Sequence, residues 1–157
     1  WRWRGRTSSG EWPGRGAALR TAPVCAFEEW ASARAASRNA TLAMRRHGAL
    51  LEGPPRVIDG VAFGGPDADV PCDVLVVHEP PHGVLDVVPT GKRIGSEKVR
   101  EKVLRLRPRL LTCGHVHESP GIERVGDTLV VNCTMGDGKT GGALIEITPA
   151  IVTARLL

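Results

Sequence analysis

Two short, largely apolar runs constrain the fold of this chain more than any other feature of its sequence. They cover residues 72–77 and 110–113, and both are rich in the Val and Leu residues typical of strands buried on both faces. Between them, Ser96 can cap a helix from Glu97 to about Leu106, and Pro108 lies just beyond its end. This order of strand, helix and strand predicts a βαβ unit with both strands parallel in one sheet.

Shorter strands on either side of this unit are predicted to form hairpins. Asp59 and Gly60 make a favourable type I′ turn pair between two apolar runs, and Gly126 and Asp127 separate a second pair of runs. The predicted hairpins cover residues 56–63, 121–132 and 143–154, the last one around Pro149. A βαβ unit accompanied by hairpins predicts an α/β fold with a mixed sheet.

The length and composition of the chain fit one globular domain. Its 157 residues are 41% hydrophobic and 24% charged, which excludes a wholly disordered or a fibrous protein. No apolar run approaches the ~20 residues that span a bilayer, so we expect no membrane partner. The four cysteines show no paired spacing, and without a secretory signal we expect reduced thiols in a cytoplasmic protein.

Residue usage changes near position 46. Residues 1–46 hold nine Arg, no Lys, three Glu and all four Trp, giving a net charge of +6, whereas residues 47–157 carry −2. A helix is plausible over 31–48, but the preceding residues show no apolar period. We expect 1–46 to be an atypical Arg- and Trp-rich segment, poorly ordered or read from a displaced frame, and 47–157 to form the domain. A basic arm for nucleic acid, or a transit peptide, is the alternative.

Three histidines follow the two buried runs. His78 follows the first run. His115 and His117 come after the second run, and His115 directly follows Gly114. In a right-handed βαβ unit both strand ends lie at one edge of the sheet, where ligands bind in open α/β proteins. Imidazole is the commonest side-chain metal ligand, and residues i and i+2 of an extended segment point to the same side. The spacing therefore predicts that three imidazoles converge on one metal site.

The motifs together resemble a known family. His78-Glu-Pro-Pro with Gly83, then Gly114-His-Val-His117, then a hairpin that ends in Val-Val-Asn132, resembles the C-terminal half of the calcineurin-like metallophosphoesterases. The similarity is greatest to the small prokaryotic phosphoesterases of that superfamily and runs from about residue 47 to residue 147. It implies a partial metallophosphoesterase β-sandwich with flanking helices.

The resemblance also implies a chemistry. In this superfamily two divalent ions clamp a phosphoryl group and activate a water molecule that attacks phosphorus. By resemblance, His78 and His115 would hold one ion and His117 the other, and the substrate would be a phosphate ester that is hydrolysed. Mn, Fe, Zn and Ni all suit mixed imidazole and carboxylate ligands, so the sequence does not select among them.

The N-terminal ligand motifs of the family are not visible in this sequence. Asp-x-His, a bridging Asp and Gly-Asn-His-Asp are absent from the expected region, so we expect the N-terminal strands to be missing or replaced. Asn39 falls where the Asn motif belongs and is a weak ligand candidate, with a surface helix position as the alternative. His82 is a weak candidate for substrate contact, with an exposed turn as the alternative. Glu79, Asp86 and Glu118 are expected to be solvated or to support neighbouring residues.

The missing carboxylates limit the chemistry that we expect. Two dications held close together repel each other strongly unless negative ligands offset their charge. We therefore expect at most one bound ion and little or no phosphodiesterase activity from this chain alone. The alternatives are a non-catalytic scaffold or single-metal binder, and a nucleic-acid-binding module that acts through the basic N-terminal arm. Nucleic acid is otherwise expected only as a substrate.

Overall fold

The computed structural model of the chain describes residues 51–134, 142–148 and 150–157. The atypical segment 1–46, the helix expected over 31–48 and Asn39 lie outside these residues and remain predictions. No helix in the described part of the chain is long and apolar enough to cross a lipid bilayer.

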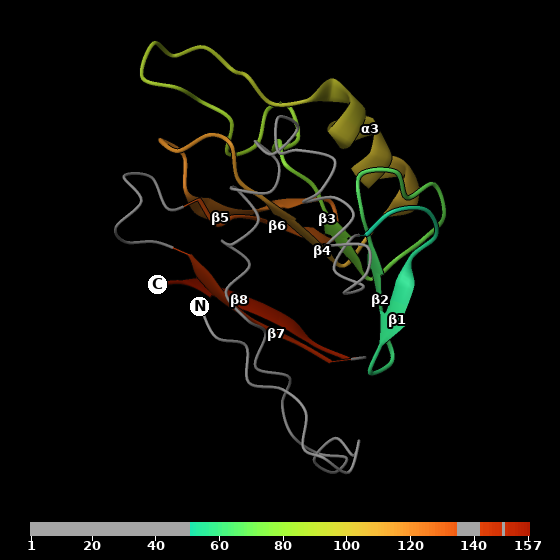
Figure 1. The fold of residues 1–157 in the computed structure, drawn as a ribbon. Helices are drawn as coiled ribbons and strands as arrows, with labels where there is room; N and C mark the ends of the chain where they lie inside the picture. Colours follow the sequence, from blue (N-terminus) through green and yellow to red (C-terminus); the bar gives the residue numbers. More distant parts are fainter. Residues whose placement is uncertain (1–50, 135–141, 149) are drawn as a thin grey trace, which may run out of the picture.

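A six-stranded mixed sheet forms the centre of the described fold (Figure 1). Its strand order is β1-β2-β3-β4-β6-β5. The inner strands β2, β3, β4 and β6 are parallel, whereas β1 and β5 pair antiparallel with β2 and β6. The strands are β1 (Arg56–Ile58), β2 (Val61–Gly64), β3 (Val74–Val76), β4 (Leu110–Cys113), β5 (Gly121–Val125) and β6 (Thr128–Asn132). The predicted mixed sheet with a parallel βαβ unit is confirmed.

Local sequence signals explain where the elements begin and end. The connecting helix α3 (Glu97–Leu106) begins where the Ser96 hydroxyl accepts a backbone N–H of its first turn, at 3.4 Å. It ends at Arg107, whose φ of 49° is left-handed. At the turn between β1 and β2, Asp59 and Gly60 have φ values of 48° and 81°. Positive φ at both central residues is the conformation that a type I′ turn requires.

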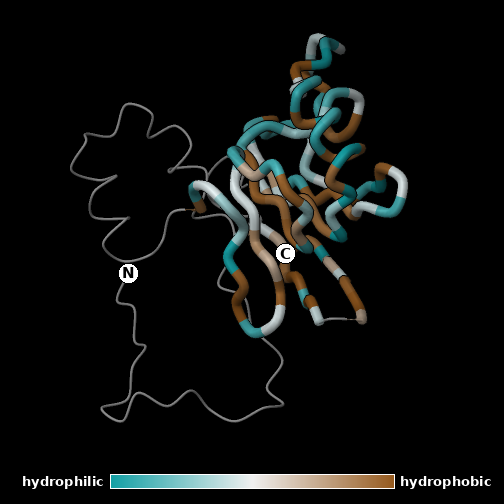
Figure 2. Tube along the Cα trace, turned by 90° about the vertical axis from the view of Figure 1, so that its right-hand side faces the viewer, coloured by the Kyte–Doolittle hydropathy of each residue, from teal (hydrophilic) through white to brown (hydrophobic). Residues whose placement is uncertain are grey.

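The sheet lies between two layers. The helix α3 and the connecting loops cover one face, and β7 (Ala143–Ile147) and β8 (Val152–Leu156) form an antiparallel pair on the other (Figure 1). Hydrophobic residues concentrate along the strands, while many loop residues are hydrophilic (Figure 2). This arrangement agrees with the partial sandwich that the family resemblance implies.

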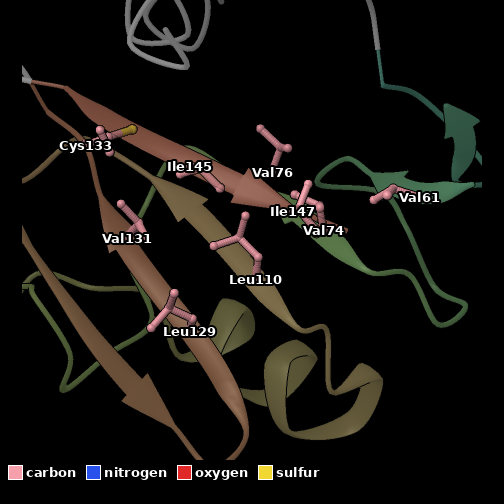
Figure 3. Packing of buried hydrophobic residues seen from close by; sticks show 10 residues of the cluster. Val61, Val74, Val76, Leu110, Leu129, Val131, Cys133, Ile145 and Ile147 are labelled. Carbon is pink, nitrogen blue, oxygen red and sulfur yellow. The ribbon is translucent and has the colours of Figure 1, made fainter. Parts of the chain in front are cut away.

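Two apolar clusters hold these layers together. In the first, Ile145 and Ile147 of β7 pack against the sheet (Figure 3), and each large side chain buried in this way contributes about 1.5–3 kcal/mol. In the second, Val103 of α3 packs against the opposite face. The sheet residues that face β7 include Val61, Val74, Val76, Leu110, Leu129 and Val131, and those that face α3 include Leu75, Leu111, Cys113 and Val130.

The register of the parallel strands brings their carboxyl ends level. Val76 of β3 pairs with Thr112 of β4. Just beyond these strands, the amide of Gly114 donates to the carbonyl of His78 at 3.0 Å. The hydrogen-bonded ladder therefore continues to the first residue of each loop and fixes where both loops start.

A buried hydroxyl in β4 leads to a prediction about stability. Thr112 is 2% exposed, and its Oγ1 has no hydrogen-bond partner among residues 51–134, 142–148 and 150–157. An unpaired buried hydroxyl loses its hydration on folding and gains nothing in return. Thr112→Val should therefore raise the free energy of unfolding by about 1 kcal/mol, which urea denaturation measures.

Thr128→Val in β6 is the matched control. The Thr128 hydroxyl is also buried, but it donates to the carbonyl of Pro108 at 2.5 Å. Its removal should lower the free energy of unfolding by about 1 kcal/mol. Equal losses of stability in the two variants would contradict the assignment of an unpaired hydroxyl to Thr112.

Candidate metal site at the sheet edge

The rings of His78 and His115 lie together at the carboxyl edge of the sheet. Their centroids are 4.7 Å apart and their planes meet at 61°. His78 follows β3 and His115 follows β4, so the two side chains come from neighbouring parallel strands. The structure thus brings together two of the three histidines that the sequence spacing assigns to one site.

The backbone at His115 takes an uncommon conformation. Its φ is 69°, in the left-handed region that non-glycine residues rarely adopt. The amide of Val116 donates to the carbonyl of Gly114 at 2.8 Å, which closes a γ-turn around His115. Val116 is fully buried, whereas His115 and His117 on either side of it are exposed. The buried valine therefore anchors the turn and leaves both imidazoles at the surface.

The spacing of the His78 and His115 rings fits a shared metal ion. An imidazole nitrogen binds Zn²⁺ at about 2.0–2.1 Å, so the centroids of two rings on one ion lie roughly 5 Å apart. The observed separation of 4.7 Å is close to this value. His117 does not complete the set, because no group of three His, Cys, Asp or Glu side chains suited to a metal ion occurs in the described part of the chain.

Asp86 organises the loop that joins β3 to α3. Its side chain is 0% exposed. Oδ2 accepts the amides of Gly83 at 2.8 Å and Gly95 at 3.3 Å, and Oδ1 accepts the guanidinium of Arg93 at 2.6 Å. The carboxylate therefore ties the two ends of this loop together. It supports neighbouring groups, as the sequence allowed, but it is buried and not solvated.

The surroundings of Asp86 lower the pKa of its carboxyl group. Burial by itself raises this pKa, because it disfavours the charged form. The amides of Gly83 and Gly95 and the guanidinium of Arg93 favour the charged form, and together they outweigh burial. Asp86 is therefore a carboxylate at neutral pH, with its charge matched by the groups around it.

Asn132 joins the two loops of the site from within the sheet. It is fully buried at the end of β6, and its Nδ2 donates to the carbonyls of Val116 and Ser119, each at 2.8 Å. The same nitrogen lies 3.5 Å from the carbonyl of Leu85. The Ser119 hydroxyl adds a second link by donating to the carbonyl of Val87 at 2.7 Å. The loop after β3 and the loop after β4 are therefore held to each other.

The sequence motifs did not identify Asn132 as a support of this site. Asn132 appears in the sequence only as the last residue of the Val-Val-Asn run. One signal was present, because a polar side chain that closes a buried apolar strand must find hydrogen-bond partners inside the protein.

His82 lies beside the first turn of α3. Its Nδ1 is 2.9 Å from Oε1 of Glu97, and its side chain is 39% exposed. Its carbonyl accepts the guanidinium of Arg100 at 2.8 Å. His82 is thus a half-exposed turn residue attached to the helix, and its contact with a substrate stays a prediction. Glu79 and Glu118 are exposed, as expected.

A known protein family matches the region that contains the candidate site. The family described as metallophosphoesterase, calcineurin superfamily, matches residues 71–152. The matched region contains both histidine motifs and every strand from β3 to β7.

Curated relatives share a shorter region with this chain. A UPF0046 protein of Caenorhabditis elegans is 39% identical over 64 residues, which are 40% of this chain and 16% of that protein. Metallophosphoesterase domain-containing protein 1 of Homo sapiens is 40% identical over 65 residues, which are 40% of this chain and 20% of that protein. An uncharacterised protein of Methanocaldococcus jannaschii is 38% identical over 63 residues, which are 37% of this chain and 29% of that protein. The chain spans less than a third of the length of these relatives.

Solved structures also share this fold, and one crystal structure illustrates the likeness. It superposes with a TM-score of 0.59 at 22% identity and covers 76% of this chain and 58% of the other. This likeness extends the match beyond the region shared with the curated relatives, and at such an identity it describes the fold alone.

The buried carboxylate leads to a prediction about pH. Asp86→Asn should lower the free energy of unfolding by about 1–3 kcal/mol at pH 7, because the charge that faces Arg93 and two amides is lost. The pKa of Asp86 in the folded state lies below its unfolded-state value of about 3.9. The contribution of the carboxylate to the free energy of unfolding is therefore complete above the unfolded-state pKa, and it disappears as the pH falls through the folded-state pKa. The difference between wild type and variant should therefore shrink below about pH 4.

Urea denaturation of both proteins between about pH 3 and pH 7 measures this difference. Asp127→Asn is the control, because the Asp127 side chain is 91% exposed and its carboxylate lies 3.3 Å from a guanidinium nitrogen of Arg107. An exposed pair of this kind contributes little. A stability difference for Asp86→Asn that does not change with pH would contradict the lowered pKa.

Proposed function

Because this chain belongs to the metallophosphoesterases of the calcineurin superfamily, we propose that its sheet edge is the histidine side of a metal site for phosphate-ester hydrolysis. Membership of the family supports a phosphoesterase type of hydrolase in general. The observation that carries the proposal for this chain is the pair of His78 and His115, with ring centroids 4.7 Å apart. Two imidazoles held this close on neighbouring strands suit one divalent ion.

Each histidine has a distinct role in this proposal. His78 and His115 bind the ion through neutral imidazole nitrogens, whereas His117, which the family resemblance assigns to a second ion, lies two residues further along the same exposed turn. When bound, the ion would act as a Lewis acid toward a phosphoryl oxygen and lower the pKa of a water molecule. His82, half exposed in the loop after β3, is proposed to contact the substrate.

The ligands in this sequence suit one ion better than two. The proposed ligands are neutral imidazoles, and they cannot offset the repulsion between two dications as bridging carboxylates do. The carboxylate motifs that the family carries N-terminal to this region do not occur in the sequence. We therefore propose one bound ion per chain. Mn, Fe, Zn and Ni all stay candidates, because the sequence does not select among them.

A test of the proposal measures metal bound to the full chain. After dialysis against Zn²⁺ and removal of free metal, elemental analysis should find about one ion per chain, and His115→Ala should lower the affinity by tenfold or more because one of the proposed ligands is lost. His47→Ala is the matched control, since it removes one imidazole outside both motifs. Equal affinities of His115→Ala and His47→Ala would contradict the proposed site.

A single-metal binder without turnover is the second candidate function. It is favoured by the presence of both histidine motifs in a sequence that lacks the carboxylate motifs. For this second candidate, the expected result is that the chain with added Mn²⁺ hydrolyses bis(p-nitrophenyl) phosphate no faster than His115→Ala does. Turnover that His115→Ala abolishes would instead assign a complete hydrolytic site to this chain.

A further inference from the structure

We propose that Asn132 is a positioning residue, which sets how the loop that carries His115 lies against the loop that begins at His78. The inference rests on the proposed function, in which these two histidines share an ion. It adds a residue that does not touch the ion and that controls the distance between the two ligands through the backbone.

The hydrogen bonds of Asn132 fix the orientation of its side-chain amide. Carbonyl groups only accept hydrogen bonds, so the nitrogen must face the carbonyls of Val116 and Ser119, each 2.8 Å away. On the other side, Oδ1 accepts the amide of Thr134 at 3.3 Å. Both ends of the amide group are thus engaged, and a flipped amide would place an oxygen against two carbonyl oxygens.

The carbonyls that Asn132 engages are close in sequence to the proposed ligands. Val116 lies between His115 and His117, and Ser119 is two residues beyond His117. The third carbonyl, of Leu85 at 3.5 Å, belongs to the loop that starts at His78. One side chain therefore reaches both loops that hold the histidine pair.

The sheet gives Asn132 a rigid base. Asn132 pairs with Cys113 of β4 and with Gly121 of β5, so hydrogen-bonded strands flank it on both sides. Its side chain is 0% exposed. A buried amide anchored in this way holds the loop carbonyls at a fixed distance from the strand ends.

The backbone of both loops is unusual where Asn132 acts. His115 has a φ of 69° and Leu85 has a φ of 53°. Residues with side chains persist in this region only where the surrounding structure holds them there. Asn132 approaches the carbonyl of Leu85 itself and engages the carbonyl of the residue that follows His115. These contacts supply the restraint that the two uncommon conformations need.

The test compares Asn132→Asp with Thr128→Val in the full chain. Asp keeps the shape of Asn and the acceptor for Thr134, but its second oxygen faces the two loop carbonyls and cannot donate to them as an ionised group. Thr128→Val removes a buried hydrogen bond, to Pro108, at the other end of the same strand. The pair separates an effect on the loops from a general loss of stability.

The first readout is the binding and absorption spectrum of Co²⁺, whose visible bands report on the geometry of its ligands. Asn132→Asp should weaken Co²⁺ binding by 10- to 100-fold and change the spectrum of the bound ion. Thr128→Val should keep the wild-type spectrum and an affinity within about twofold. Wild-type affinity and spectrum in folded Asn132→Asp would overturn the inference.

The second readout needs no metal. The rings of His78 and His115 are close enough for a nuclear Overhauser effect between their protons. It should be present in the wild type and in Thr128→Val and absent in Asn132→Asp, and its persistence in Asn132→Asp would overturn the inference. If the wild type binds no Co²⁺ but shows this Overhauser effect, the proposed function is refuted. Loss of the Overhauser effect in Asn132→Asp would still support the positioning role of Asn132.

A second variant covers the case in which Asn132→Asp does not fold. Asn132→Ser retains one short donor in place of the amide, so it leaves the loop carbonyls of Val116 and Ser119 only partly restrained. Asn132→Ser should weaken Co²⁺ binding by less than the roughly 10- to 100-fold expected for Asn132→Asp. It should also reduce the nuclear Overhauser effect between the ring protons of His78 and His115. Unchanged values for both in a folded Asn132→Ser protein would overturn the inference.

Discussion

The parallel hydrogen-bonded ladder of β3, β4 and β6 is the constraint on which the rest of this structure depends. It aligns three strand ends, and the bond from the amide of Gly114 to the carbonyl of His78 extends it to the first residues of two loops. Because backbone hydrogen bonds allow little variation in distance, the histidines that follow these strands start from nearly fixed positions. Strand register therefore sets the positions from which the loops that carry His78 and His115 start.

Buried polar side chains hold the loops beyond that ladder. Asp86 closes the loop after β3 on itself, and Asn132 attaches the loop after β4 both to the sheet and to its neighbour. Each is fully buried and makes several hydrogen bonds, so removing either would leave buried backbone groups without partners. These bonds tie the two loops to each other and to the sheet, and the role that we propose for Asn132 acts through them.

Much of the scaffold follows from local patterns in the sequence. The apolar runs predict β3 and β4, Ser96 predicts the start of α3, and the Asp59-Gly60 pair predicts a turn whose two φ values are both positive. The meeting of His78 and His115 follows from the βαβ connection. The roles of Asp86 and Asn132 could not be predicted in this way, because their partners are backbone groups brought near only by folding. No periodicity or spacing in the chain records which carbonyl lies beside which side chain. The role of Asn39 stays a prediction, because it lies outside the described residues.

The central claim is that one divalent ion binds between imidazoles from two neighbouring strand ends. Anomalous X-ray diffraction from crystals of the full chain grown with Zn²⁺ tests it most directly, because the signal locates the metal without reference to activity. The account predicts one strong anomalous peak within coordination distance, about 2.0–2.1 Å, of a nitrogen of both His78 and His115. Ordered imidazoles at the sheet edge with no peak between them, or a peak bound by other residues, would contradict it.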